Sequence, residues 1–205
     1  QVPAKKTRFI TYCQRIAAIL LLPVIIAIVA LMMKKDHQEP LIAYNEVTAP
    51  YGMVSSLTLP DSSKVWLNAG STLKYPTAFT SNVREVEMSG EAYFEVHADK
   101  EHPFIVNTGD LKVTATGTAF NICSFAKAQE EVITLVTGKV AVSQENNIKH
   151  LLPGQQLNYQ RASKSMEITD IDTYKYISWK DGILAFRDDP LKSIFNRLEQ
   201  VYQVR

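Results

Sequence analysis

Two histidines lie among acidic residues and form the first group of side chains that could do chemistry. His97 and His102 are accompanied by Glu95, Asp99 and Glu101. Imidazole and carboxylate groups bind zinc when three or four of them converge with fixed geometry. The spacing here matches no usual zinc motif, and the stretch is interpreted as a strand end followed by a polar turn. We therefore predict no metal site and no cofactor.

The sequence lacks the motifs of catalytic hydrolases, and the chain is predicted not to be an enzyme. It contains no Gly-x-Ser-x-Gly sequence and no cysteine paired with an evident base. Its two cysteines, Cys13 and Cys123, are too few for a disulfide framework. Cys123 alternates with apolar neighbours and is predicted to be an ordinary strand residue.

Trp66 and Tyr93 are a further candidate pair, because aromatic rings can form a platform for a sugar. The residues on either side of each ring are apolar, and in a strand they must face the opposite way. The two rings are therefore expected to be exposed. They support an alternative function for the chain, that of a membrane-tethered periplasmic binding module for glycans or envelope partners.

The elements that must position these residues begin with an apolar run over 16–33 that holds no charged residue. As a helix it would reach about 27 Å, close to the roughly 30 Å of a bilayer's hydrocarbon core. Because it lacks the small-x-small end of a cleaved signal peptide, we predict a transmembrane helix. Four basic residues precede it, which favours a cytoplasmic tail at 1–15 and an extracytoplasmic remainder.

The charge balance argues against direct binding of nucleic acid. The formal net charge is +1, and no acidic residue occurs before Asp36, so the remainder of the chain is mildly acidic. Phosphate binding needs a concentrated basic face, which this remainder does not offer.

Residues 51–160 follow a linker at 34–50 and alternate in short runs separated by turns. Leu57 and Leu59 share one face of a strand, a Pro-Asp-Ser-Ser turn follows, and Val65 and Leu67 return on the facing strand. Further turn residues recur at the spacing of about 8 to 12 positions that is typical of β domains. The pattern predicts a mainly β fold, either an all-β sandwich or a solenoid-like stack.

The period changes after a predicted linker at 161–178. Ile183, Leu184 and Phe186 are predicted to form a strand, and the apolar residues from Leu191 to Tyr202 follow helical spacing. Residues 179–205 are thus expected to be the β-α start of a small α+β domain. Because the sequence opens on glutamine rather than methionine and ends within a pattern, we expect both ends to continue in a longer protein.

Six short motifs follow one another through the β region. They are Leu57-Thr-Leu-Pro-Asp-Ser-Ser-Lys-Val-Trp-Leu-Asn-Ala-Gly-Ser-Thr-Leu73, Gly90-Glu-Ala-Tyr-Phe-Glu-Val96, Pro103-Phe-Ile-Val106, Gly117-Thr-Ala-Phe120, Gly138-Lys-Val-Ala-Val142 and Pro153-Gly154. In this order, and behind a transmembrane span, they resemble the FecR family of transmembrane anti-sigma regulators. Residues 179–205 are similar to the start of the short N-terminal module of secretins and TonB-dependent receptors, which many members carry at their C-terminus.

The resemblance implies a single-pass protein of the bacterial inner membrane, with the N-terminus in the cytoplasm and the C-terminus in the periplasm. In this family the signalling domain of an outer-membrane TonB-dependent receptor acts on the periplasmic part. Envelope proteases then cut the regulator, and an extracytoplasmic-function (ECF) sigma factor is released. The sigma-binding region of the family lies before the residues present here, so no residue of this chain is assigned to it.

Two candidate sites follow. Some members of the family are split at a Gly-Thr pair, to which Gly117-Thr118 corresponds, and a threonine hydroxyl can attack the preceding carbonyl carbon in an N-to-O acyl shift. Alternatively, Gly117 only supplies a turn or a bulge. The edge of the predicted strand at Ile183, Leu184 and Phe186 is the candidate partner-binding surface, because an edge strand offers unpaired backbone groups. The apolar residues of the helix that follows are expected to pack on the domain's own sheet.

Overall fold

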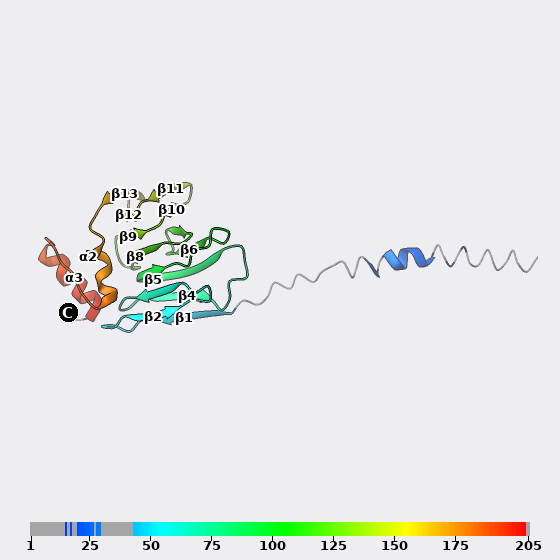
Figure 1. Ribbon diagram of the computed structural model, residues 1–205, viewed down its shortest axis with the longest axis horizontal. Coiled ribbons are helices and arrows are strands. Elements are labelled where there is room, and N and C mark those ends of the chain that lie inside the picture. Colours follow the sequence, from blue (N-terminus) through cyan, green and yellow to red (C-terminus); the bar gives the residue numbers. More distant parts are fainter. Residues whose placement is uncertain (1–14, 16, 18–19, 27, 30–42, 204–205) are drawn as a thin grey trace, which may run out of the picture. The chain divides into compact units, whose positions relative to one another are not determined.

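The computed structural model describes residues 15, 17, 20–26, 28–29 and 43–203, and the chain divides into two units, Gln1–Leu41 and Ile42–Arg205. In the first unit the described residues from 15 to 29 are helical (blue in Figure 1). No helix within the described residues is both long and apolar enough to cross a membrane. The transmembrane helix predicted over 16–33 lies partly outside these residues and stays a prediction.

The second unit is built on a 13-stranded sheet in which two groups of strands share one long strand, β5 (Arg84–Glu95). Half-sheet A has the order β1-β4-β5-β6-β7-β10-β11, and its other strands are β1 (Tyr44–Thr48), β4 (Thr72–Pro76), β6 (Phe104–Asn107), β7 (Lys112–Ala115), β10 (Val140–Gln144) and β11 (Asn147–Leu151). Half-sheet B has the order β2-β3-β5-β8-β9-β12-β13, and its other strands are β2 (Ser55–Thr58), β3 (Lys64–Leu67), β8 (Ala119–Ser124), β9 (Glu130–Thr137), β12 (Gln155–Gln160) and β13 (Ser165–Asp170).

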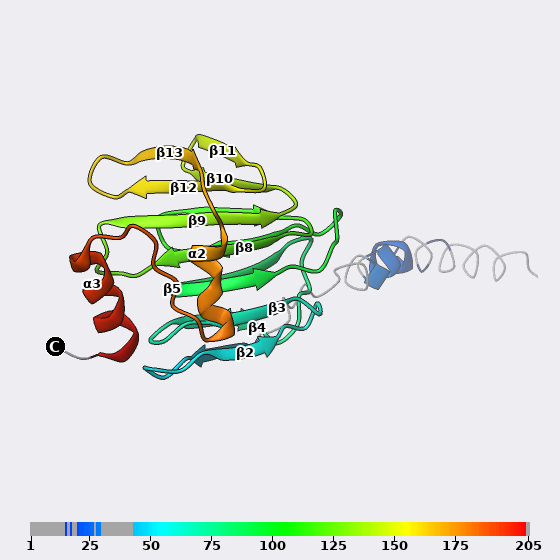
Figure 2. The same cartoon turned by 60° about the vertical axis from the view of Figure 1, so that its left-hand side comes forward.

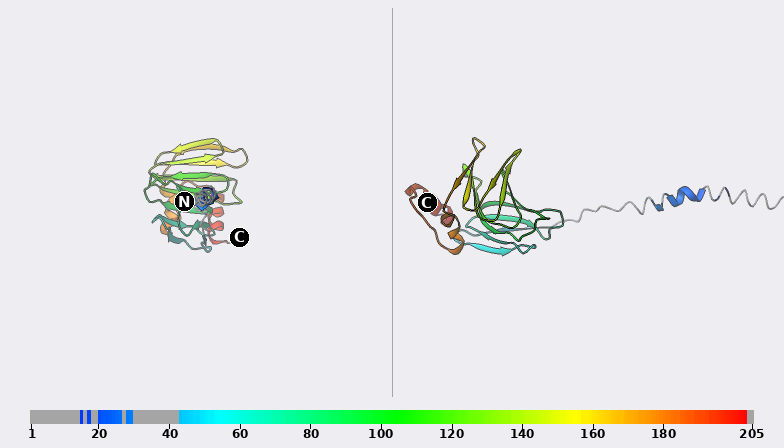
Figure 3. Two further views of the ribbon diagram at one scale, coloured as in Figure 1. Left: turned by 90° about the vertical axis from the view of Figure 1, so that its right-hand side faces the viewer. Right: turned by 45° about the horizontal axis from the view of Figure 1, so that its top comes forward.

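Strand β5 passes from one half-sheet to the other at Gly90. Residues before it pair with β4 and β6, and residues from Gly90 onward pair with β3 and β8. Gly90 has φ +105°, and a Cβ atom there would come within 2.4 Å of the Ser71 hydroxyl oxygen. Only glycine fits this position, because it tolerates both the positive φ and the close approach. The sheet therefore folds over itself in a nearly closed, barrel-like arrangement (Figure 3).

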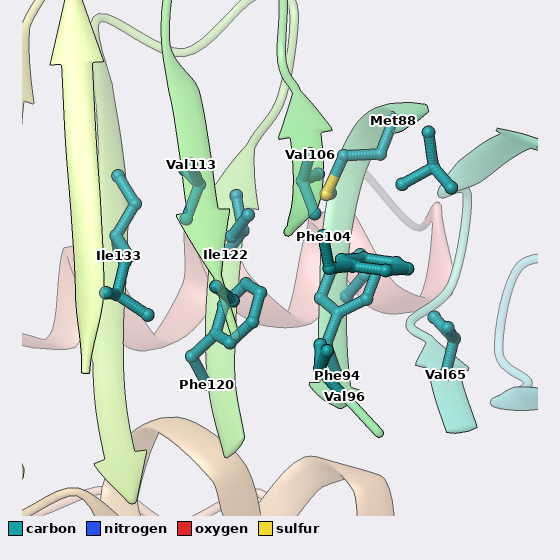
Figure 4. Packing of buried hydrophobic residues seen from close by; sticks show 14 of the residues in the cluster. Val65, Met88, Phe94, Val96, Phe104, Val106, Val113, Phe120, Ile122 and Ile133 are labelled. Atoms are coloured by element: carbon teal, nitrogen blue, oxygen red, sulfur yellow. The ribbon is translucent and has the colours of Figure 1, made fainter. Parts of the chain in front are cut away.

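The hydrophobic core fills the space between the two half-sheets. Phe94 stacks on Phe120 with ring centroids 5.2 Å apart, and Phe104 meets Phe94 at 6.1 Å (Figure 4). Ile133 of β9 and Val113 of β7 belong to the same buried cluster. Because the cluster draws side chains from both half-sheets, it holds them together as one unit.

The prediction of a mainly β fold is confirmed, and its form is a nearly closed, barrel-like sheet in place of the predicted sandwich or solenoid-like stack. The predicted hairpin is present, with Leu57 opposite Val65 in the β2–β3 pair. The stretch predicted as a linker at 161–178 is instead structured, because β13 completes half-sheet B and pairs with β12 along its whole length. Helix α2 (Tyr174–Ile177) follows β13 after a short connection.

The C-terminal segment lies against the outer face of half-sheet B (Figure 2). It comprises α2, the short 3₁₀ helix η1 (Ser178–Asp181) and the predicted helix, α3 (Leu191–Tyr202). The strand predicted at Ile183–Phe186 is absent, and this stretch is an irregular connection between η1 and α3. Alternating apolar residues form a strand only beside a hydrogen-bonding neighbour, and no strand pairs with this stretch within residues 43–203.

Candidate functional site

The Gly117–Thr118 pair lies in the connection between β7 and β8. Gly117 has φ +132°, a conformation that residues other than glycine avoid. A Cβ atom there would come within 2.8 Å of the Ala98 Cβ and 2.9 Å of its Cα. The backbone of the predicted processing site is thus tightly enclosed at a position that only glycine can occupy.

The Thr118 hydroxyl is buried and makes no hydrogen bond. Thr118 is 5% exposed, and its Oγ1 atom is one of two buried side-chain polar atoms without a partner in the described part of the chain. Its carbonyl oxygen, in contrast, accepts a hydrogen bond of 2.9 Å from the Val96 N–H. A buried polar group is nearly always hydrogen-bonded, and an unpaired one points to a functional role or to strain.

A hollow of about 580 Å³ lies beside the junction and brings polar side chains to it. Glu95, His97 and Lys64 line it together with Thr118. Tyr93 lines it too, but burial, aided by the charges of Glu95 and Asp181, raises the pKa of its phenol to about 12, so the phenol is neutral at pH 7. Glu95 and His97 are therefore the groups beside the hollow that could accept a proton from a hydroxyl.

The loop that packs on Gly117 is held by a buried ion pair. Arg84 Nη1 lies 2.6 Å from Asp61 Oδ2, and both side chains are buried. The same guanidinium donates from Nη1 to the His97 carbonyl oxygen at 3.1 Å and from Nε to that of His102 at 2.8 Å. The loop after β5 therefore cannot shift without breaking several bonds of a charged group. Sequence reasoning missed Arg84. The sequence feature that could have identified it is an arginine at a position where an alternating strand turns its side chains inward.

The histidine and carboxylate group predicted to be a polar turn lies in this loop. Strand β5 ends at Glu95, and Asp99 accepts a hydrogen bond of 3.1 Å from the His102 N–H while its Oδ2 lies 2.8 Å from His102 Nδ1. These bonds lower the pKa of the Asp99 carboxyl to about 2. Asp99 and His102 thus stabilise the turn by bonding to each other.

A second polar cluster lies between half-sheet B and the C-terminal segment. Trp179 is 2% exposed, and its Nε1–H donates to Asn121 Oδ1 at 3.2 Å. Glu91 is buried and accepts from the side-chain amides of Asn68 at 2.7 Å and Asn121 at 3.1 Å. Arg197 of α3 lies 3.6 Å from the same carboxylate. Sequence reasoning missed this cluster, which could have been suspected from Glu91, an acidic residue directly before the apolar residues Ala92–Phe94.

The aromatic pair proposed as a sugar platform is covered. Tyr93 is 4% exposed, against expectation, because its ring faces the C-terminal segment. The rings of Trp66 and Tyr93 lie 5.7 Å apart, and the Lys180 ammonium sits 5.9 Å and 5.5 Å from their centres. The sequence could not reveal this cover, which is formed by residues more than 80 positions later. The platform is unavailable while the segment stays in place.

The predicted partner-binding residues lie apart from the Gly117–Thr118 hollow. Ile183 and Phe186 are exposed and Leu184 is half-buried, and none of the three lines that hollow. The helix after them also differs from expectation, because Leu191 and Phe195 are 72% and 64% exposed instead of packed on a sheet. The structure therefore places Thr118, His97 and Glu95 around one hollow, which none of the predicted partner-binding residues lines.

Comparison with known proteins places these features in a wider group. The model of the family described as FecR protein matches residues 45–149. Two crystal structures of a "putative anti-sigma factor" from Parabacteroides distasonis ATCC 8503 are similar to this chain at 35% identity, with TM-scores of 0.74 and 0.73. Each alignment covers 78% of this chain, and 76% and 75% of the respective crystallised chains. A comparison with curated proteins found no match.

Proposed function

This chain belongs to the FecR protein family, and we propose that it is an anti-sigma factor that relays an external signal to a cytoplasmic sigma factor. The observation that carries the proposal is the 35% identity to the Parabacteroides protein, which extends over about three quarters of both chains. The residues of the FecR match build most of the 13-stranded sheet. The proposal therefore rests on the domain as a whole and not on a short motif.

The proposed signalling route runs across two membranes. The signalling domain of an outer-membrane TonB-dependent receptor acts on the periplasmic residues, and an ECF sigma factor is the cytoplasmic partner. The support for an inner-membrane anchor is the uncharged apolar run at 16–33 with basic residues before it. A single helix transmits small conformational changes poorly, so proteolytic cutting by envelope proteases is a discrete way to end sigma-factor binding.

The Gly117–Thr118 bond is the proposed point of self-processing. The Thr118 hydroxyl oxygen attacks the Gly117 carbonyl carbon, the C–N bond breaks, and the hydroxyl proton moves to the Thr118 nitrogen, which leaves an ester and a free amine. Water then hydrolyses the ester to a Gly117 carboxylate and restores the hydroxyl. Three features support the proposal: the unpaired buried hydroxyl, the positive φ of Gly117 and the enclosure by Ala98.

The proposed partner-binding surface includes Ile183, Leu184 and Phe186. An edge-strand mode of binding lacks support, because these residues form no strand. The exposed side chains of Ile183 and Phe186 remain available to a partner. In the parent bacterium, replacing both by serine is expected to reduce receptor-dependent induction without unfolding the β domain, which can be checked by circular dichroism.

Transcription in the parent bacterium tests the function. Deleting the gene should change the transcripts of one sigma-factor regulon, and re-expression of the protein should restore them, as measured by RNA sequencing. A deletion that leaves every such regulon unchanged, in the presence and in the absence of the inducing nutrient, contradicts the proposal. Saturable binding of a polysaccharide by the purified chain, combined with that unchanged profile, would instead favour the glycan-binding alternative.

A further inference from the structure

Helix α3 is only partly covered by the protein: its apolar residues Ile194, Leu198 and Val201 are half-buried, and its other apolar residues are exposed. Leu191, Phe195 and Tyr202 are 72%, 64% and 53% exposed, and no residue of the helix is buried. Asn196, Arg197 and Gln200 line the space between the helix and half-sheet B. An amphipathic helix that is a fixed part of a domain usually buries its apolar side completely, which α3 does not do. The closed position of α3 therefore buries little apolar surface.

The space beneath α3 is not close-packed. Two hollows, of about 330 Å³ and 1100 Å³, lie between the helix and half-sheet B, and Cys123, Asn196 and Gln200 line both of them. Both hollows open to solvent, whereas elements that are firmly packed leave little space between their side chains. Helix α3 thus stands off the sheet for much of its length.

A small number of polar contacts hold α3 in place. Arg197 Nη2 lies 3.6 Å from Glu91 Oε1, and the Gly52 N–H donates to the Val201 carbonyl oxygen at 2.8 Å. At the base of the segment, in contrast, Trp179 is 2% exposed and bonded to Asn121. The connection between them, residues 183–190, has no regular structure. A firm anchor is followed by an irregular connection and then by a loosely held helix.

We propose that α3 is a hinged flap that swings away from half-sheet B about residues 183–190, with Trp179 as its fixed anchor and the Arg197–Glu91 pair as its latch. Opening the flap costs little burial, since Leu191, Phe195 and Tyr202 are exposed in both positions and the other apolar side chains of α3 are only half-buried in the closed one. It uncovers the Glu91 carboxylate and the Cys123 thiol. The device goes beyond the proposed signalling role, and its test needs neither the receptor nor the sigma factor.

Cys123 is a built-in reporter of the flap. It is half-buried under α3, and burial together with the nearby Glu91 charge raises the pKa of its thiol well above the ordinary range. The charge of Arg197 opposes this shift. If α3 stayed closed, removing Arg197 would raise the thiol pKa further and slow its reaction with a maleimide, because the thiolate is the reacting form. If α3 opens, the reaction becomes faster, so the two cases differ in sign.

The experiment uses the complete chain carrying Cys13→Ser, in which Cys123 is the remaining cysteine. The rate of labelling by a bulky fluorescent maleimide is measured at pH 7 in the parent, in Arg197→Ala and in Lys192→Ala. Lys192 is exposed on the same helix and serves as the matched control. We expect labelling to be roughly tenfold faster in Arg197→Ala and unchanged in Lys192→Ala, since losing a charged latch raises the open population by about that factor.

Hydrogen exchange separates flap opening from unfolding. In Arg197→Ala the amides of α3 are expected to exchange faster, whereas those of β8 keep the parent's protection. Labelling of Arg197→Ala that is equal to or slower than that of the parent overturns the proposal. It is overturned as well if the faster labelling is accompanied by an equal loss of protection in β8, because Cys123 would then be reached through unfolding of the sheet.

Discussion

The hydroxyl group of Thr118 is a potential nucleophile that its surroundings do not engage in a hydrogen bond. Its hydroxyl is buried without a hydrogen bond, while the backbone on both sides is held by the Val96 bond and by contact with Ala98. A hydroxyl that is engaged elsewhere would have to break a bond before attacking a carbonyl. Thr118 has no such bond to break, so its environment is compatible with attack on Gly117.

The mass of the intact protein tests self-processing at Thr118. We expect the folded parent to yield two fragments that divide after Gly117, and Thr118→Ala to remain a single chain. Thr118→Ser keeps the hydroxyl and is expected to be cut. An uncut parent whose β domain is folded would remove self-processing and leave Gly117–Thr118 with a purely structural role.

Alanine substitutions at Gly117 and Gly109 can be compared to measure how tightly Ala98 encloses the Gly117–Thr118 junction. Both have positive φ, but a Cβ atom at Gly109 would meet nothing within 4 Å, whereas one at Gly117 would overlap Ala98. Alanine at 109 should lower the free energy of unfolding by about 1 to 3 kcal/mol through backbone strain alone. Alanine at 117 should cost roughly 2 kcal/mol more through overpacking.

Urea denaturation in a Thr118→Ala background gives both values on an uncut chain. Equal losses for the two glycines would mean that Ala98 moves aside freely. The enclosure of the processing site would then be slight.

At the scale of elements, Trp179 is the residue that fixes the C-terminal segment to the sheet. Removing its side chain leaves a large cavity and an unpaired Asn121 oxygen, and Trp179→Ala is expected to destabilise the fold by about 3 to 5 kcal/mol. Tyr174→Ala, at a position 50% exposed in the same segment, should cost less than about 1 kcal/mol. Equal midpoints in urea for the two variants would show that the segment adds nothing to the stability of the domain.

The elements that sequence reasoning predicted correctly are those with a local signal. The β2–β3 hairpin combines alternating apolar residues with a Pro-Asp-Ser-Ser turn, and α3 has helical periodicity after Pro190. The motifs also identified Gly117 and Thr118 as candidates, because some members of the family that they resemble are split at a Gly-Thr pair.

The features that depend on distant partners could not be predicted. Ile183–Phe186 alternates as a strand does but has no neighbouring strand, and Tyr93 is buried by a segment that follows it by more than 80 residues. Strand β5 is buried on both faces from Gly90 to Phe94, which indicates that another element covers the outer face of half-sheet B. A strand that is buried on both faces must pack against another element on each side. The sequence around Glu91 does not show which element that is.

At the scale of the whole molecule, the proposed orientation across the membrane places the β domain in the periplasm. A reporter enzyme that is active only in the periplasm should be active when fused after Asp172 and silent when fused before Arg15. The expectation follows from the basic residues that precede the apolar run. The opposite pattern of activity would place the β domain in the cytoplasm and out of reach of an outer-membrane receptor.

The pairing of β5 with β8 spans the Gly117–Thr118 bond, since β1–β7 precede that bond in the chain and β8–β13 follow it. Strand β7 is joined to β10 in the same way. After cleavage the two fragments would therefore stay associated through the hydrogen bonds of these strand pairs. They should elute as one species in size-exclusion chromatography until denaturant is added. A force along the strands would act on all hydrogen bonds between the fragments at once. A force perpendicular to the strands would break these hydrogen bonds one after another. The direction of the force, and not the cut itself, would then decide when the pieces separate.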